Sequence, residues 1–291
     1  MNVRGPLRRI LLSERLNFAL TNRIPRAALT RLMGRVSKVR QPLVRDASIA
    51  LWRWFADVDL ADAAAPRYAS LHDAFTRALK PGARPPDARV DVLASPCDAI
   101  VGACGRIERG ELHQIKGARY TLSELVVDSA LVDTYAEGCY ATLRLTAGMY
   151  HRFHAPHDAI VERVTYVAGD LFNVNATALR RVPRLYCRNE RAIVRLRLAA
   201  TRETVTLVPV AAVLVASIRL HFLNVVLGLT HAGPNEFRCS TSVTKGMELG
   251  WFEHGSTIVV LAPRGYSLCE NVRERATVRA GAALMRRRVT R

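Results

Sequence analysis

The sequence lacks the short motifs that mark the commonest nucleotide, metal and hydrolase sites. It contains no P-loop, no G-x-G-x-x-G after a strand pattern, no H-E-x-x-H and no G-x-S-x-G. The six cysteines form no C-x-x-C pair and show no metal-ligand spacing; they are Cys97, Cys104, Cys139, Cys187, Cys239 and Cys269. This pattern favours free thiols in a reducing compartment over a disulfide framework. We therefore expect a cytoplasmic protein without a metal site.

Long apolar runs are also missing. A long run without charged residues or histidine, residues 204–218, has 15 residues and contains Pro209, whereas a membrane-spanning helix needs roughly 20 apolar residues. Its many β-branched residues instead indicate a buried strand. No positively charged start leads into an apolar run with a small-residue cleavage site, so we expect no secretory signal.

Acidic residues are few compared with basic ones. The chain has 43 Lys and Arg but only 25 Asp and Glu, a net charge of +18, which attracts polyanions such as nucleic acid or an anionic membrane surface. Residues 1–54 hold twelve Lys or Arg and only Glu14 and Asp46, so more than half of the excess lies there. Charge alone does not distinguish the two kinds of partner.

The amino-terminal part carries two amphipathic patterns. In residues 25–39, apolar and basic side chains alternate at helical spacing. The apolar positions are Leu29, Leu32, Met33 and Val36, and the basic ones are Arg26, Arg31, Arg35 and Lys38. A second helical pattern, residues 43–58, includes Leu51, Trp52, Trp54 and Phe55, which suit a bilayer interface. Both segments could instead pack on a core, and the patterns leave this open.

Helical periodicity fades after a turn-rich loop at residues 80–86. Short runs rich in Val, Ile and Thr then alternate with turn signals, for example residues 159–167, 192–198 and 257–261. The sequence therefore predicts an α+β fold. We expect a helical, basic amino-terminal region, residues 1–62, followed by a mainly antiparallel β body, residues 63–291.

A histidine cluster stands out in the β region, because residues 151–157 contain three histidines. Along a strand, His151 and His154 would point to opposite faces, so both could meet one ligand only across a bend. Taken alone, the cluster is either a metal or acid–base site or a polar loop.

Several separated segments resemble, in order and spacing, the bacterial phosphatidylserine decarboxylase proenzyme family. They read YASLHDAFTRALKPGARPP (68–86), SPCDA (95–99), QIKG (114–117), YHRFHAP (150–156), GDLFNVN (169–175), RNER (188–191) and KGMELGWFEHGST (245–257). The resemblance covers about two thirds of the chain, through residue 265. It departs from the family at Ala99, Ala211 and Ala216, where the family usually has glycine, and added methyl groups near a pocket could alter the substrate.

The resemblance implies a chain that processes itself. The Ser256 hydroxyl would attack the carbonyl of Gly255, with His154 as the base and Asp98 as the carboxylate that orients it, a Ser-His-Asp relay defined by roles. Cleavage between residues 255 and 256 would leave a large chain, 1–255, and a small chain, 256–291. The former Ser256 would become a pyruvoyl group that caps the small chain.

The resemblance also implies the reaction. The pyruvoyl group would form an imine with the amine of phosphatidylserine and accept the electrons left when carbon dioxide departs, giving phosphatidylethanolamine. His151, or His154 after processing, is the candidate proton donor, while His157 and His254 are expected to be structural. A diverged relative acting on another amino acid or serine derivative is the alternative. A non-catalytic basic protein would leave the Gly255-Ser256-Thr257 match unexplained.

The expected partners follow from the resemblance and from the basic amino-terminal region. We expect residues 1–62 to associate with the membrane and to hold the protein peripherally at the cytoplasmic face of the cell membrane, where phosphatidylserine is presented. The two processed chains would stay together, a homodimer is plausible, and no nucleic acid is expected. No metal is expected, because the pyruvoyl group derived from Ser256 is the cofactor.

Overall fold

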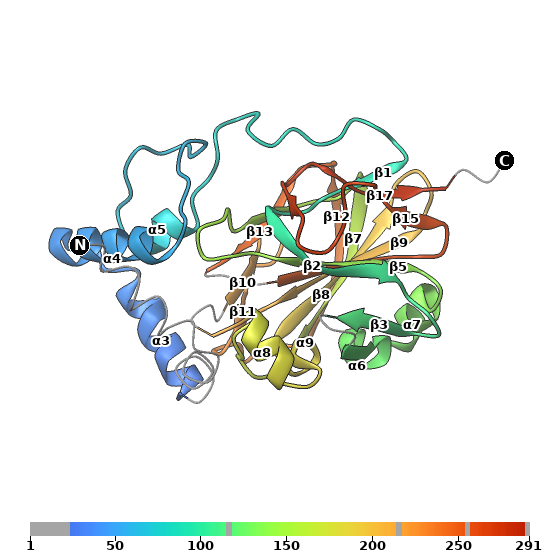
Figure 1. The fold of residues 1–291 in the computed structure, drawn as a ribbon, viewed down its shortest axis with the longest axis horizontal. Helices are drawn as coiled ribbons and strands as arrows, with labels where there is room; N and C mark the ends of the chain where they lie inside the picture. Colours follow the sequence, from blue (N-terminus) through green and yellow to red (C-terminus); the bar gives the residue numbers. More distant parts are fainter. Residues whose placement is uncertain (1–23, 115–117, 214–216, 254–256, 289–291) are drawn as a thin grey trace.

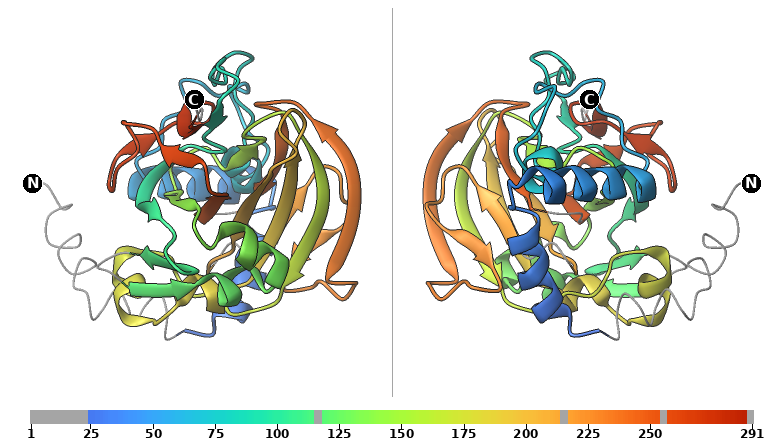
Figure 2. Two further views of the ribbon diagram at one scale, coloured as in Figure 1. Left: turned by 90° about the vertical axis from the view of Figure 1, so that its right-hand side faces the viewer. Right: turned by 90° about the vertical axis from the view of Figure 1, so that its left-hand side faces the viewer.

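The computed structural model describes residues 24–114, 118–213, 217–253 and 257–288. Three helices come first in this part of the chain: α3 (Arg26–Val36), α4 (Pro42–Phe55) and α5 (Leu71–Phe75). They lie together at one side of a β body (Figures 1 and 2). We call residues 26–77, which contain these three helices, the helical region of the structure. The predicted order, helical region first and β body second, is confirmed.

The starts of α4 and α5 are fixed by side-chain caps. The Gln41 side chain accepts a hydrogen bond from the backbone N–H of Val44 at 2.8 Å, and Pro42 occupies the first turn of α4. Ser70 Oγ accepts from the N–H of Asp73 at 3.1 Å at the start of α5. Both caps satisfy backbone donors that a helix start otherwise leaves unbonded.

The main sheet has eight strands, all paired antiparallel, in the order β12-β7-β8-β9-β14-β5-β2-β16. Their bounds are β2 (Ala99–Arg106), β5 (Cys139–Arg144), β7 (Ala159–Val167), β8 (Arg191–Leu198), β9 (Thr204–Val210), β12 (Glu236–Val243), β14 (Thr257–Ala262) and β16 (Thr277–Val278). Every residue of β14 is buried, because it pairs with β9 and β5. Such a strand reads as a continuous apolar run, Thr257 to Ala262.

A second sheet carries the histidine cluster. Its order is β11 (Val226–Gly228), β10 (Ser217–Leu220), β13 (Glu248–Phe252) and β6 (Arg152–His154), again antiparallel. β13 contains Gly250, where an added Cβ would lie 1.9 Å from the Arg219 carbonyl oxygen. Only glycine therefore allows β10 and β13 to pair this closely.

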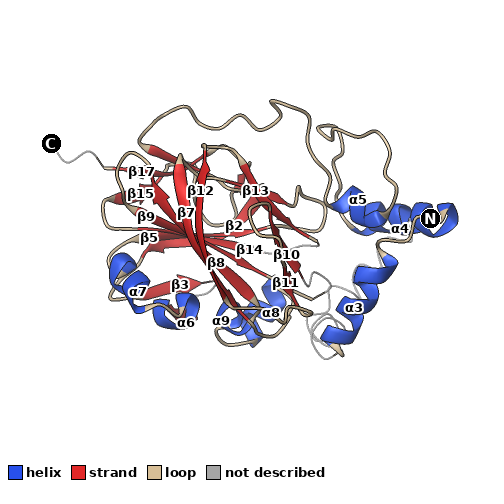
Figure 3. Ribbon diagram, turned by 180° about the vertical axis from the view of Figure 1, so that it is seen from behind, coloured by secondary structure: helices blue, strands red, loops and turns tan. Residues whose placement is uncertain are grey.

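Smaller elements complete the body. A three-stranded sheet joins β1 (Val92–Ala94), β17 (Ala283–Arg287) and β15 (Tyr266–Leu268), and a hairpin joins β3 (Glu111–Gln114) and β4 (Ala118–Thr121). Four short helices lie at one end of the main sheet (Figures 1 and 3): α6 (Leu122–Val126), α7 (Ser129–Tyr135), α8 (Ala176–Arg181) and α9 (Leu185–Arg188). The buried Arg191 of β8 ties α6 and α9 to the sheet, donating to the carbonyls of Leu125, Glu124, Cys187 and Asn189.

Helix α3 is attached to the body by ion pairs. Arg26 donates through Nε and Nη2 to the two carboxylate oxygens of Asp170, at 2.9 and 2.7 Å, and lies over the ring of Phe172 at 4.2 Å. Past the helix end, Lys38 Nζ lies 3.4 Å from a carboxylate oxygen of Glu253. Two of the four basic side chains expected in this amphipathic helix are thus engaged by the body.

All six cysteines are free, in agreement with the sequence analysis. Within the described ranges, no helix is long and apolar enough to cross a membrane. The same ranges contain no group of three or more His, Cys, Asp and Glu side chains placed to hold a metal ion. The boundary expected at residues 62 and 63 stays a prediction.

Candidate active site

The expected cleavage pair, Gly255 and Ser256, lies outside the described residues, as does His254. The nearest described residues are Glu253, after β13, and Thr257, the first residue of β14. Thr257 is fully buried between Arg144 and Val210 of the neighbouring strands. The other expected site residues, Asp98, His151 and His154, are all described.

His154 ends strand β6, and both of its ring nitrogens have partners. Nδ1 lies 2.9 Å from the carbonyl oxygen of Gly246, and Nε2 lies 3.0 Å from the hydroxyl of Tyr150. Since a carbonyl can only accept, the hydrogen-bond network assigns the proton to Nδ1 and leaves Nε2 to accept from Tyr150. Burial lowers the pKa of His154, so the ring is neutral and its Nε2 can take a proton.

Gly246 owes its place to its backbone conformation. Its φ is +83°, and a Cβ there would lie 2.9 Å from Cγ of Pro86. A side chain would be both strained and crowded at this position. The glycine of the Lys245-Gly246 motif therefore shapes the turn whose carbonyl orients His154. The family motif pointed to Gly246, but it did not predict that the Gly246 carbonyl orients His154.

Asp98 has different partners from those expected. Arg84 donates to it through Nε and Nη2, at 2.9 and 2.8 Å, and the N–H of Ala280 donates to Oδ1 at 2.8 Å. Within the described chain, neither oxygen is hydrogen-bonded to His154. Asp98 and Tyr150 do line one cavity of about 150 Å³. The structure thus joins Asp98 to Tyr150 across a cavity and Tyr150 to His154 by a hydrogen bond.

His151 is fully buried on the loop before β6. Its Nε2 donates to the carbonyl of Thr146 at 3.0 Å, and its ring stacks on Phe75 of α5 with centroids 4.0 Å apart. Its own carbonyl accepts from the N–H of Phe252 at 3.0 Å, next to the cleavage segment. His151 and His154 therefore have separate surroundings, which allows separate roles.

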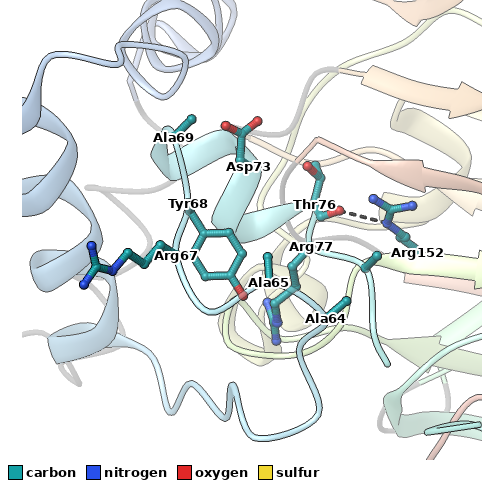
Figure 4. A pocket seen from close by; sticks show the side chains of 10 residues that line it. Ala64, Ala65, Arg67, Tyr68, Ala69, Asp73, Thr76, Arg77 and Arg152 are labelled. Atoms are coloured by element: carbon teal, nitrogen blue, oxygen red, sulfur yellow. Dashed lines mark hydrogen bonds between the residues drawn. The ribbon is translucent and has the colours of Figure 1, made fainter. Parts of the chain in front are cut away.

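A second cavity, of about 300 Å³, lies between α5 and the loop that precedes it (Figure 4). Three arginines line it: Arg67, Arg77 and Arg152. Asp73 is the one acidic side chain in its wall, and Arg152 is already paired with Glu248 at 2.9 Å. Arg77 also lines the Asp98 cavity. This positive lining suits an anionic group near the site.

Arg77 was not singled out from the sequence, although it lies in the Phe75-Thr76-Arg77 part of a matched segment. It is only 4% exposed, and its guanidinium donates to the carbonyls of Ala74, Asp59 and Gly148. Burial lowers its pKa. His157, expected to be structural, is on the surface and contacts the carbonyl of Val90 at 2.9 Å.

Comparisons with known proteins identify the family. The family model described as phosphatidylserine decarboxylase matches residues 71–286. The phosphatidylserine decarboxylase proenzyme of Shewanella woodyi is 33% identical over 287 residues, 92% of this chain and 97% of that protein. The proenzyme of Acinetobacter baumannii is 34% identical over 255 residues, 86% of this chain and 88% of that protein. The chain therefore belongs to the phosphatidylserine decarboxylase family of carboxy-lyases.

Proposed function

We propose that the chain decarboxylates phosphatidylserine to phosphatidylethanolamine with a pyruvoyl group made from its own Ser256. The observation that carries the proposal is the half-buried His154, whose basic nitrogen Nε2 is oriented within a family match that contains Gly255-Ser256-Thr257. The name proenzyme in the relatives is consistent with a chain that is cleaved.

Processing needs a base for a weakly acidic hydroxyl. His154 Nε2 takes the proton of Ser256, and the serine oxygen attacks the carbonyl carbon of Gly255. The peptide C–N bond breaks, an ester replaces it, and the imidazolium returns the proton to the released amine. Loss of the Ser256 α-proton then expels the Gly255 carboxylate, and hydrolysis of the dehydroalanine releases ammonia and leaves the pyruvoyl group.

The described residues on both sides of positions 254–256 are held in place by the fold, as a fixed prosthetic group requires. Thr257 is locked into the middle of the main sheet, while Phe252 is held by the carbonyl of His151. The pyruvoyl group would supply an electron sink for the electron pair left on the substrate's α-carbon when carbon dioxide departs. In our proposal, His151 donates the proton that replaces the carboxylate, and the cavity lined by Arg67, Arg77 and Arg152 faces the acidic headgroup.

Two departures from the family pattern, Ala99 and Ala211, leave the cavities near the site unchanged. Ala99 and Ala211 are at most 1% exposed, and neither lines the cavities near Asp98 or Arg67. Their extra methyl groups are packed in the body and do not narrow either cavity. Ala216 lies outside the described residues.

We also propose that α4 holds the protein peripherally at the cytoplasmic face of the membrane. None of its residues is buried, and its exposed apolar side chains are Leu43, Val44, Leu51, Trp54 and Phe55. An exposed apolar patch beside basic side chains is typical of helices that lie in a bilayer interface. A homodimer and the absence of nucleic-acid binding stay predictions.

Intact mass of the purified protein tests the central proposal. We expect two chains, residues 1–255 and a 36-residue chain that begins with the pyruvoyl group at position 256, together with release of carbon dioxide from phosphatidylserine. The Ser256→Ala variant should show one mass near 32.3 kDa and no activity. A single intact mass in a preparation that decarboxylates phosphatidylserine would overturn the mechanism.

A further inference from the structure

Three consecutive carbonyl groups just before the histidine cluster are each held by a different side chain. The carbonyl of Thr146 accepts from His151 Nε2 at 3.0 Å, that of Ala147 from Trp52 Nε1 at 2.9 Å, and that of Gly148 from Arg77 Nη2 at 3.0 Å. We call residues 146–148 the carbonyl loop. Most protein hydrogen bonds join two backbone groups, whereas here three side chains hold the backbone of one loop.

Two of the three donors come from the helical region. Trp52 belongs to α4, and Arg77 follows α5. The same region also lies close against the loop backbone at Gly148. A Cβ on this glycine would lie 2.1 Å from the carbonyl oxygen of Asp57. The helical region therefore determines where the carbonyl loop lies.

A second path joins Trp52 to His151 through aromatic rings. The ring of Trp52 lies 5.8 Å from that of Phe75, and Phe75 stacks on His151 at 4.0 Å with an angle of 24° between the planes. The guanidinium of Arg77 lies 5.8 Å from the Trp52 ring. The imidazole is thus fixed on its face by Phe75 and at Nε2 by Thr146. Trp52 contacts Phe75 and the carbonyl of Ala147, the residue after Thr146.

His154 is supported in another way. Its ring nitrogens contact Tyr150 and Gly246, and its own N–H bonds to the carbonyl of Pro96. These contacts all come from the β body or from the turn before it. A change at Trp52 therefore reaches His151 through Phe75 and the carbonyl loop, while the ring contacts of His154 stay intact.

From these contacts we infer that Trp52 is a positioning residue for the decarboxylation step: α4 sets the place of His151 through the carbonyl loop and Phe75. The inference rests on the proposed function, in which His151 donates a proton to the substrate. Proton transfer is sensitive to placement, since a shift of about 1 Å can cost about 100-fold in rate. Self-cleavage, which uses His154, does not depend on Trp52.

The test compares Trp52→Phe and Trp52→Leu with the wild-type chain on phosphatidylserine in detergent mixed micelles. We expect complete cleavage by intact mass in both variants, which also shows that they fold. We expect kcat to fall about threefold for Trp52→Phe, which keeps a ring but loses the N–H, and about 30-fold for Trp52→Leu. KM should change less than kcat.

Trp54→Leu is the matched substitution, because Trp54 lies on the same helix but is 46% exposed. Any loss it causes should appear in KM for the lipid surface. The decisive comparison adds Trp52→Leu to His151→Ala. If Trp52 acts through His151, the second change should lower kcat by less than twofold, whereas independent effects multiply.

An unchanged kcat in Trp52→Leu would overturn the inference, and so would a full 30-fold further loss in the His151→Ala background. Failure of the proposed function looks different, because it appears in the wild-type chain as missing cleavage or missing carbon dioxide release. If the wild-type enzyme and His151→Ala both turn over normally, His151 is not part of the site. The inference about Trp52 then fails as well.

Discussion

The helical region and the β body are held in place by different forces. In the body, whole strands such as β14 are buried on both faces, so apolar burial stabilises them. Helix α4 buries none of its residues, and α3 buries only Thr30. These helices are placed by a few specific contacts, such as Arg26 with Asp170 and Trp52 with Ala147. The body is rigid by packing, while the helices are positioned by contacts that single substitutions can remove.

The same division separates the two chemical steps of the proposal. The described groups around His154, namely Tyr150, Gly246 and Pro96, belong to the body. His151 is shared, because Phe75 of the helical region covers its ring. We therefore expect changes in the body to affect cleavage, and changes in the helices to affect decarboxylation or membrane binding.

The largest expected effect is on cleavage. His154→Ala removes the base and should slow self-cleavage about 10²- to 10⁴-fold, as followed by the mass of the chain after synthesis in vitro. Asp98→Ala should also stay uncleaved, because it unpairs the half-buried Arg84 in the cavity that Asp98 shares with Tyr150, the residue that contacts His154. His157→Ala, which changes an exposed histidine, is the control and should cleave normally. Normal cleavage of His154→Ala would show that another base serves Ser256.

The second-largest expected effect is on decarboxylation and concerns His151, which contacts both regions. His151→Ala should cleave completely but decarboxylate about 100-fold more slowly, because the proton donor is lost while the His154 contacts stay in place. Intact mass and carbon dioxide release from the same preparation measure the two steps together. Loss of cleavage in this variant would contradict the separation between the two histidines.

Substitutions in the β body should lower the free energy of unfolding more than substitutions in the helical region. Leu196→Ala, in the fully buried centre of β8, should lower the free energy of unfolding by about 2–5 kcal/mol. Arg26→Ala, which breaks a partly exposed ion pair, should cost about 1 kcal/mol or less. Urea unfolding in the uncleaved Ser256→Ala background measures both. Equal losses would mean that α3 is part of the cooperative core.

The sequence predicted the parts of the fold that depend on local periodicity. The two amphipathic patterns, residues 25–39 and 43–58, became α3 (Arg26–Val36) and α4 (Pro42–Phe55). The order of strands could not be predicted in this way, because β14 pairs with β9 and β5 over separations of about 50 and 115 residues. Local alternation carries no information about which distant strand is the partner.

The site shows a similar limit. The resemblance supplied the identities of Asp98, His151 and His154, but hydrogen-bond partners depend on the folded arrangement. Gly246 came from a motif 92 residues away from His154. Trp52 was expected at the membrane interface, yet it contacts Phe75 and the Ala147 carbonyl. Tryptophan has a large apolar ring and one N–H donor, so it fits a bilayer surface and a partly polar contact within a protein equally well.

Membrane binding should respond to α4 more than to α3. Leu51→Ser with Phe55→Ser removes two exposed apolar side chains and should weaken flotation with both anionic and neutral liposomes. Arg31→Glu with Arg35→Glu should weaken binding only to anionic liposomes at low salt, since each arginine adds about 1 kcal/mol that salt screens. Lys38 is left unchanged because it contacts Glu253. Equal binding by all three proteins would mean that the membrane contact lies elsewhere.

The smallest expected effect is a shift in the pH dependence of cleavage. His154 must be neutral to accept the serine proton, and burial already lowers its pKa below the ordinary value of about 6.5. Cleavage should therefore persist below pH 6.5 and fail only when the buried ring becomes protonated. The Tyr150 hydroxyl adds to this effect, because a hydrogen bond donated to Nε2 stabilises the neutral ring.

Tyr150→Phe removes that hydrogen bond without opening the site to solvent, so the pKa of His154 should rise. The midpoint of the cleavage rate should then move to higher pH. Cleavage should be slower than wild type near pH 6 and similar near pH 8, in time courses of freshly synthesised chain. Tyr266→Phe, whose hydroxyl donates to Glu203, is the matched control and should keep the wild-type midpoint. A slower rate at every pH with an unchanged midpoint would mean that Tyr150 takes part in the proton transfer itself rather than tuning His154.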